Sequence, residues 1–340
     1  MTKKTIWHLA TLLLHIFFCA QVYAQHTTEF LFSETAPDYL RKMMQSNAEA
    51  VFKEVNLACD QNKSGLALSL SNVTQDGIKR IQSIWSTSHF YCTETYITTR
   101  VLKSSNGYQV RNIPLFFIQG SKPEDQYQDI VIEFTREGKI NDMYIAIAPH
   151  QYAKIMENSN EVNDWRYRQM IIELVENFRT AYNRKDIPFL EDIFSDDALI
   201  ITGKVLTPQK RGDVPVAFNQ AQIQYSVYNK KQYIANLKRI FGINSYINIK
   251  FEEIVVTRHE GNPNIYGVTL KQNWNSTTYS DEGWLFLMID YEDENNPLIW
   301  VRTWQPFTDP NTGRPIRYNT EDIFGLGSFP VRQFGNKTIF

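Results

Sequence analysis

Residues 170–203 read MIIELVENFRTAYNRKDIPFLEDIFSDDALIITG, and this stretch decides the fold of the second half of the chain. Its first part repeats apolar residues at three- and four-residue steps, which predicts a long helix with one apolar stripe that other elements must cover. Asn183–Lys185 ends that helix, and the Asp186 carboxylate can cap a second, short helix by accepting the free amide protons of its first turn. Ser195-Asp196-Asp197 then precedes the apolar strand Ala198–Thr202. The stripe consists of Ile171, Leu174, Val175, Phe178, Ala181 and Tyr182.

The segments FRTAYNRKD, FLEDIF and SDDALIITG resemble the opening of the nuclear transport factor 2-like (NTF2-like) superfamily, which includes ketosteroid isomerase, scytalone dehydratase and SnoaL-like polyketide cyclases. A helix expected at Lys230–Phe241 and four strand-like runs that end at TWQP extend the resemblance over residues 165–307. The resemblance implies an α+β fold, in which a curved antiparallel sheet wraps around the long helix as a cone with a pocket inside.

The first 24 residues have the pattern of a secretory signal peptide, with two lysines, an apolar run at Ile6–Phe18 and Val22-Tyr23-Ala24 before the cleavage position. A retained membrane anchor is the alternative, but two histidines interrupt the run and it is shorter than the ~20 residues that a span needs. We therefore expect an exported protein that starts near Gln25, in the periplasm or outside the cell, with the bacterial envelope favoured.

Length and charge restrict the class of protein further. Cleavage would leave 340 − 24 = 316 residues, enough for about two domains of ~150 residues each. The signal holds two of the 35 basic residues and none of the 37 acidic ones, so the mature balance is 33 − 37 = −4. A mild charge without a clustered basic face predicts no nucleic-acid binding. No later apolar stretch is long enough to span a membrane, and the sequence leaves a homodimer open.

Residues 25–157 are expected to form an N-terminal α+β domain. Its first residues, 25–37, are expected to be mobile, and a short strand is expected at Gly65–Leu70. The order of helices followed by an antiparallel meander echoes the second half, so a degenerate second cone and an unrelated α+β layer both stay open. The helices are predicted at Asp38–Cys59 and Gln75–Trp85, and the strands at Phe90–Leu102, Gln109–Ile118, Tyr127–Phe134 and Ile140–Ile147.

The polar, asparagine-rich segment Glu157–Asp164 is the expected domain boundary, and residues 165–307 form the expected cone domain. Within it, Lys204–Tyr228 has little periodicity and is predicted to be a loop. A β-bulge near Glu252-Glu253 would reconcile two apolar runs of opposite parity. Residues 308–340 contain enough apolar side chains to form a strap over the cone.

Two cysteines, Cys59 and Cys92, follow the signal segment. In an oxidising compartment two thiols can pair, but sequence alone does not show whether the sulfur atoms meet. A disulfide between them and two buried thiols are both open at this point.

The resemblance also allows a test of activity, since ketosteroid isomerase uses a helix tyrosine as oxyanion donor and a strand aspartate as base. Phe178 and Thr202 occupy these two positions here. A phenyl ring donates no hydrogen bond, and a threonine hydroxyl is too weak a base for this role. The sequence also lacks nucleophile-elbow, HExxH, P-loop and dinucleotide-binding motifs and any cluster with metal-ligand spacing. We therefore predict no catalytic residue, no metal and no cofactor.

Together these features favour an exported, non-enzymatic protein whose pocket binds a small apolar or aromatic molecule, or a segment of a partner protein. The same aromatic side chains would equally fill the cone as ordinary core. The alternative function is an envelope lyase, isomerase or hydrolase of the same superfamily. The run Leu298–Gln305 is expected to place Trp300, Arg302 and Trp304 on one face. The candidate lining residues are Phe178, Tyr182, Thr202, Trp274, Trp284, Arg302 and Trp304.

Overall fold

The computed structural model describes residues 27–33, 36–104, 107–118, 126–157, 162–206, 221–316, 324–329, 332–334 and 337–339. The expected signal peptide at residues 1–24 lies outside these ranges. Among the helices of the described ranges, none is both long and apolar enough to cross a membrane.

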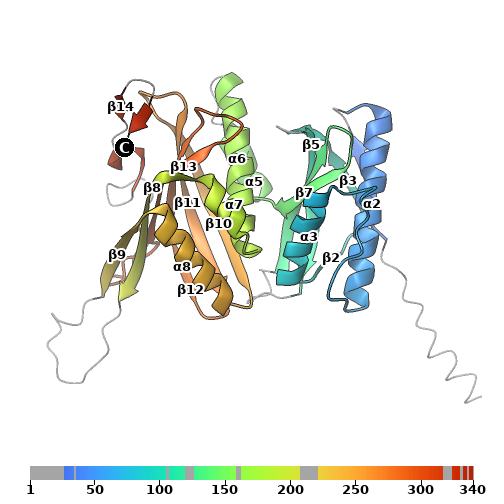
Figure 1. Cartoon of the computed structure of the whole chain (residues 1–340), viewed down its shortest axis with the longest axis horizontal. Helices are drawn as coiled ribbons and strands as arrows, with labels where there is room; N and C mark the ends of the chain where they lie inside the picture. The colour runs from blue at the N-terminus through green and yellow to red at the C-terminus, as the bar shows by residue number, and fades with distance from the viewer. Residues whose placement is uncertain are drawn as a thin grey trace, which may run out of the picture.

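The first half of the chain packs two helices against an antiparallel sheet (Figure 1). The sheet order is β2-β5-β6-β7, with β4 paired to β5, and β1 pairs in parallel with β3 as a separate two-stranded sheet. The predicted helices and meander are therefore confirmed. The elements are β1 (Glu29–Ser33), α2 (Asp38–Asp60), α3 (Gln75–Thr87), β2 (Phe90–Cys92), β3 (Tyr96–Arg100), β4 (Leu102–Lys103), β5 (Gly107–Phe117), β6 (Tyr127–Thr135) and β7 (Ile140–Ile145).

Three expectations for this half were wrong in detail. The terminus is not loose, because β1 places Phe30 and Phe32 in the core on alternate positions. The predicted strand at Gly65–Leu70 does not form, and its backbone bonds instead to side chains, with Leu66 accepting from the Gln82 amide at 2.6 Å. The long strand predicted at Phe90–Leu102 is divided into β2, β3 and β4, because its parts pair with different partners.

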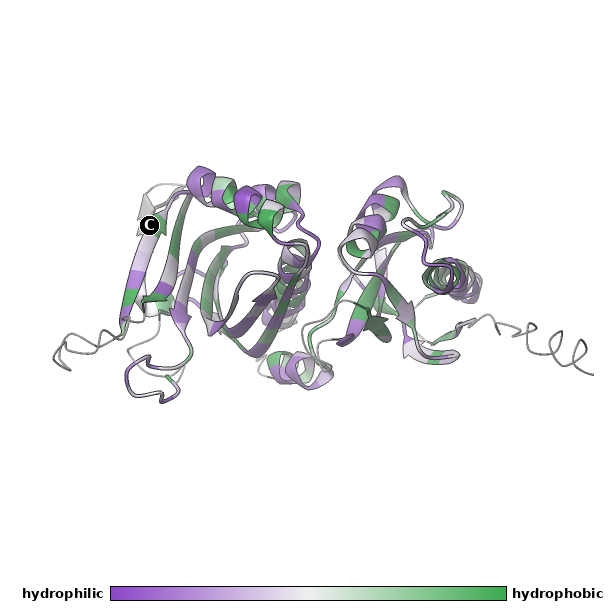
Figure 2. Ribbon diagram, turned by 90° about the horizontal axis from the view of Figure 1, so that it is seen from below, coloured by the Kyte–Doolittle hydropathy of each residue, from purple (hydrophilic) through white to green (hydrophobic). Residues whose placement is uncertain are grey.

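The second half forms the expected cone around a long helix (Figure 1). Its six-stranded sheet has the order β10-β11-β12-β13-β8-β9, in which all neighbours are antiparallel except β13 and β8. Seen from below, this sheet curls, and helix α8 lies along its open side (Figure 2). The elements are α5 (Pro149–Glu157), α6 (Val162–Asn183), α7 (Ile187–Ile193), β8 (Phe194–Leu206), β9 (Gln222–Tyr228), α8 (Lys230–Ile243), β10 (Ile247–Arg258), β11 (Ile265–Ser276), β12 (Ser280–Asp290) and β13 (Leu298–Pro306).

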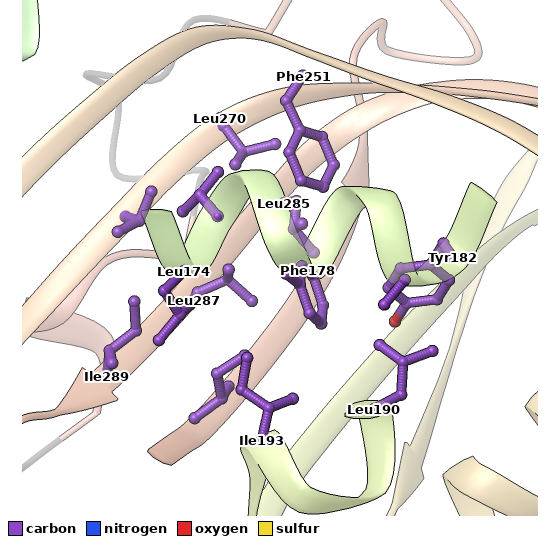
Figure 3. Packing of buried hydrophobic residues seen from close by; sticks show 14 of the residues in the cluster. Leu174, Phe178, Tyr182, Leu190, Ile193, Phe251, Leu270, Leu285, Leu287 and Ile289 are labelled. Atoms are coloured by element: carbon purple, nitrogen blue, oxygen red, sulfur yellow. The ribbon is translucent and has the colours of Figure 1, made fainter. Parts of the chain in front are cut away.

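The predicted stripe of α6 faces the concave side of the sheet. Phe178 is fully buried at its centre, among side chains from α7 and the sheet strands (Figure 3). Asp186 caps α7 as predicted, since its carboxylate accepts from the Phe189 amide at 3.1 Å. The predicted bulge is also present, as the β10–β11 register shifts between Glu252 and Val255.

The hairpin between β8 and β9 corrects the expectation of a long loop at Lys204–Tyr228. Strand β8 starts at Phe194, runs on to Leu206 and pairs with β9, so that Leu206 lies opposite Gln222. Residues 207–220 of the predicted loop lie outside the described ranges. Exposed Val227 shows why periodicity failed here, because β9 is an edge strand that carries apolar side chains into solvent.

The C-terminal residues that the structure describes cover the convex face of the sheet. Phe324, Leu326 and Phe329 pack on a second apolar cluster, and the Phe329 ring stacks on Phe286 with 5.8 Å between centroids. Leu326 belongs to a 3₁₀ turn, η2 (Leu326–Ser328), and the short hairpin of β14 (Arg332–Phe334) and β15 (Lys337–Ile339) follows.

Cys59 and Cys92 are both free thiols, so the alternative of a disulfide is not realised. Cys92 is buried, and its thiol donates to the Glu94 carbonyl at 3.7 Å. Cys59 is only half-buried, which departs from the expectation of two buried thiols.

Helix α6 also packs its other side on the first half of the chain. Glu176 is fully buried, forms an ion pair with Arg111 of β5 and accepts from the Ile147 amide at 2.7 Å. Thr180 accepts from the Ile145 amide at 3.0 Å. The buried apolar side chains of the two halves form separate clusters. One is drawn from residues between 30 and 143, and the other from residues between 147 and 299. The exact domain limits stay a prediction.

Candidate functional site

A cavity of about 460 Å³ opens between helix α8 and the concave face of the sheet. Its walls come from α8 and from β8, β11, β12 and β13, so residues distant in sequence meet there. The lining combines aromatic rings with a few polar and charged groups, as small-molecule sites do. The aromatic lining residues are Tyr228, Tyr233, Trp274, Tyr279 and Trp304.

Four of the seven predicted lining residues are at this cavity. They are Thr202, Trp274, Arg302 and Trp304. Tyr182 lies behind the wall, because its hydroxyl is 2.5 Å from the hydroxyl of lining residue Tyr233.

Two of the predicted residues are not at the cavity. Phe178 is core, with its ring centroid 5.0 Å from that of Tyr182 and 6.0 Å from that of Phe194. Trp284 lies outside the lining, and its indole nitrogen donates to the Ile316 carbonyl at 2.6 Å. The cone is therefore filled along α6 and hollow beneath α8. The predicted aromatic residues are ordinary core in the first part and line a cavity in the second.

Trp300 does not share a face with Arg302 and Trp304 as the sequence predicted. The pairing of β13 shifts between Ile299 and Val301, which turns Trp300 toward the convex cluster. Arg302 lies opposite Leu287 and Ile200, both core residues of the concave side. The bulge thus places Trp300 on the convex side of the sheet and leaves Arg302 at the cavity.

Arg302 is the most unusual group in the lining. It is 5% exposed, and its guanidinium carbon lies 5.3 Å from the centre of the Tyr233 ring. Its Nε and Nη1 atoms have no hydrogen-bond partner. Burial opposes its charged form, but the neighbouring Tyr233, Tyr182 and Asp281 favour that form and keep the pKa of Arg302 above its usual range. The cavity therefore contains a permanent, buried positive charge.

Asp281 is a half-buried carboxyl group at the same cavity. Burial raises its pKa to about 6, against the lowering effects of the Tyr279 hydrogen bond and the Arg302 charge. The Tyr279 hydroxyl donates to Oδ2 at 2.9 Å, while Oδ1 has no partner. A carboxyl group with this pKa changes charge near neutral pH.

The end wall of the cavity is fixed by Asn244, which ends α8. Its side-chain oxygen accepts from the Thr278 amide at 3.0 Å and the Thr278 hydroxyl at 2.8 Å. Its amide nitrogen donates to the Ile240 carbonyl at 2.9 Å. These bonds join the end of α8 to the β11–β12 turn. They therefore fix the position of this end of the helix relative to the sheet.

Two glycines make room for the Trp304 indole. A Cβ at Gly203 would lie 2.8 Å from the ring, and one at Gly283 would lie 2.4 Å from it. The indole, which is 4% exposed, therefore lies close to two backbone segments, where a side chain larger than glycine would clash with it.

Sequence reasoning missed Asp281 and Tyr233. Asp281 lies opposite Trp274 in the β11–β12 ladder, and only the register of that pairing places it at the cavity. Tyr233 did give a signal, because it shares an apolar helical face with Leu237 and Ile240 on α8. Asp196, which precedes the predicted strand at Ala198–Thr202, is not at the cavity and forms an ion pair with Lys230 at the surface. Within the described ranges no group of three or more His, Cys, Asp or Glu side chains could hold a metal ion.

No protein-family model and no curated protein matches this sequence. Bd1075 of Bdellovibrio bacteriovorus is similar in structure, with 14% identity and a TM-score of 0.32, and the match covers 51% of this chain and 59% of that one. An NTF2-like protein of Cytophaga hutchinsonii is 14% identical with a TM-score of 0.31, over 41% of this chain and 97% of that one. ActVI-ORFA of Streptomyces coelicolor is 8% identical with a TM-score of 0.30, over 41% and 96%. Of these three, the protein of Cytophaga hutchinsonii is the one described as NTF2-like.

Proposed function

We propose that this chain binds a small, flat organic molecule in the cavity beneath α8. The cavity itself carries the proposal, because about 460 Å³ lies within the ~300–1,000 Å³ of known small-molecule sites. A space of this size, lined by aromatic rings, is what a ligand site requires.

The walls favour an aromatic or polycyclic body. Trp274 and Trp304 come from neighbouring parts of the curved sheet, and Tyr233 faces them from α8. Aromatic pairs are attractive in offset or edge-on arrangements beyond the area that they bury. A flat ring system would be in contact with several of these side chains at once.

The proposal includes export and binding without turnover. Export rests on the signal-like pattern of residues 1–24. Binding without turnover is supported by the two positions that matter in ketosteroid isomerase, since Phe178 is outside the lining and Thr202, which lines the cavity, is too weak a base.

A second candidate function, a lyase or isomerase, is favoured by one observation. Asp281 is a cavity carboxyl group whose pKa of about 6 suits proton transfer near neutral pH. If a bound compound is converted and Asp281→Asn stops the conversion while binding persists, the enzyme hypothesis replaces the binding hypothesis. Mass spectrometry of each bound compound after incubation makes this comparison.

The binding proposal is tested with N-phenyl-1-naphthylamine, a neutral aromatic dye that fluoresces in apolar sites. We expect saturable binding to the wild-type protein. Ile240→Trp, which places an indole in the cavity, should abolish it, because the volume is then filled. Ala235→Trp is the matched control, since Ala235 is exposed on the same helix and outside the lining.

Both variants should keep the circular dichroism spectrum of the wild type. A dye that fails to bind the wild type, or that binds Ile240→Trp equally well, would refute a ligand site at this cavity. Mass spectrometry of the mature protein tests export separately, with a first residue near Gln25 expected.

A further inference from the structure

The position of Arg302 restricts what kind of ligand the cavity can take, if the cavity is a ligand site as proposed above. The side chain enters from β13, in the middle of the curved sheet, and is 5% exposed. It is therefore not a surface arginine that water solvates. Burying a guanidinium is unfavourable unless anionic or hydrogen-bonding groups compensate for the lost water.

Compensation within the described residues is incomplete. Arg302 Nε and Nη1 donate to no acceptor, and no carboxylate of the described residues forms an ion pair with this guanidinium. The guanidinium donates a hydrogen bond to the Tyr182 hydroxyl, the Tyr233 ring covers it at 5.3 Å, and Asp281 acts on it only through the longer-range field. Nε and Nη1 are covered by protein atoms, so a ligand would reach the guanidinium only where Arg302 lines the cavity.

Two of the three other charged residues of the lining have the same sign as Arg302. Lys204 lies on β8 and Arg239 on α8, and both are exposed at the cavity. Asp281 is the acidic residue among the lining side chains. With three cationic groups against one carboxyl group, the lining attracts an anion and disfavours a cation.

We propose that the ligand is a flat aromatic molecule with one anionic oxygen-bearing group, a carboxylate or a sulfonate, which binds Arg302 while the rings lie against Trp274 and Trp304. This inference rests on the proposed function and specifies its ligand class. The anionic group would pair with the guanidinium where Arg302 lines the cavity, and interactions between ionised partners are stronger than neutral ones. The aromatic body would bury the apolar part of the wall.

Two dyes that differ in one group test the inference. 8-Anilinonaphthalene-1-sulfonate and N-phenyl-1-naphthylamine share their ring system, and only the first has a sulfonate. We expect Arg302→Met to weaken binding of the sulfonate dye at least about tenfold, as loss of a buried charged partner implies. The neutral dye should change by less than about threefold, because its contacts are with the rings.

Arg166→Met is the matched control, because it makes the same substitution at an exposed arginine outside the lining of this cavity. It should change the affinity for either dye by less than about threefold, since exposed charges are screened. Only fluorescence that Ile240→Trp abolishes is counted as cavity binding. A thermal melt of each variant confirms that it is folded at the assay temperature.

The outcomes separate the two proposals. If neither dye binds the wild-type cavity, the proposed function is wrong and this inference falls with it. If the neutral dye binds but Arg302→Met leaves the sulfonate dye within threefold of wild type, the cavity is a ligand site and the anionic class is wrong. Equal weakening of both dyes would show that Arg302 only shapes the cavity, which also overturns the inference.

Discussion

The buried ion pair between Arg111 and Glu176 should hold the two halves of the chain together. Arg111 belongs to β5 of the first sheet and Glu176 to α6, and their side chains are 8% and 0% exposed. Arg111 Nη1 donates to Glu176 Oε2 at 3.0 Å, and Nη2 donates to Oε1. The pair is thus far from water and central to the contact between α6 and the sheet.

Arg111→Met should destabilise the protein by about 3–5 kcal/mol, because it leaves the Glu176 charge buried without its partner. Glu176→Gln should cost less, about 1–3 kcal/mol. It keeps an acceptor for the Ile147 amide, and Arg111 keeps the Gln109 side-chain oxygen at 3.0 Å and the Tyr152 ring at 4.7 Å. The double variant removes both partners of this pair, so it should be about 1–3 kcal/mol more stable than the sum of the single losses implies.

Urea denaturation followed by circular dichroism gives these free energies of unfolding. Arg166→Met is the control, since the Arg166–Glu294 pair is exposed at the arginine and should be worth about 0–1 kcal/mol. A loss of under 1 kcal/mol for Arg111→Met, or strictly additive losses in the double variant, would refute the assigned role of this pair.

Four further predictions follow from single groups. Asp281 loses its negative charge below a pKa of about 6, so the sulfonate dye should bind several-fold more tightly at pH 5 than at pH 7.5, and Asp281→Asn should remove this difference. Burial and the charge of a nearby glutamate raise the pKa of Glu133 from 4.5 to about 8. The free energy of unfolding therefore falls as the pH rises between these two values. The Glu133→Gln variant should melt at a higher temperature than wild type at pH 9 but not at pH 5. Phe178→Ala should cost about 3–5 kcal/mol in urea denaturation, as the ring is 0% exposed, and a loss under 1 kcal/mol would place it outside the core. Cys59 and Cys92 should both react with a thiol reagent in the denatured, unreduced mature protein, and absence of reaction would show a disulfide.

Much of the cone was predictable because its signals are local. The α6 stripe, the Asp186 cap and the bulge near Glu252 each depend on spacing within a few turns or one strand, and each is present in the structure. Four of the seven candidate lining residues also line the cavity, because alternation along strands holds where no bulge intervenes.

The errors arose where pairing between distant segments decided the result. Trp300 is displaced by a bulge in β13 that only the partner strands reveal. Trp284 lies opposite Gln305 and bonds to Ile316, a residue of the C-terminal segment that the local pattern could not place. The cavity itself exists because Asn244 anchors α8 to a turn more than thirty residues away. Local periodicity contains none of this information.

A crystal structure of the protein with 8-anilinonaphthalene-1-sulfonate tests the central claim most directly. The rings should lie between α8 and the sheet, against Trp274 and Trp304, with the sulfonate next to the Arg302 guanidinium. Dye bound elsewhere, or in this cavity with its sulfonate directed away from Arg302, would contradict the account.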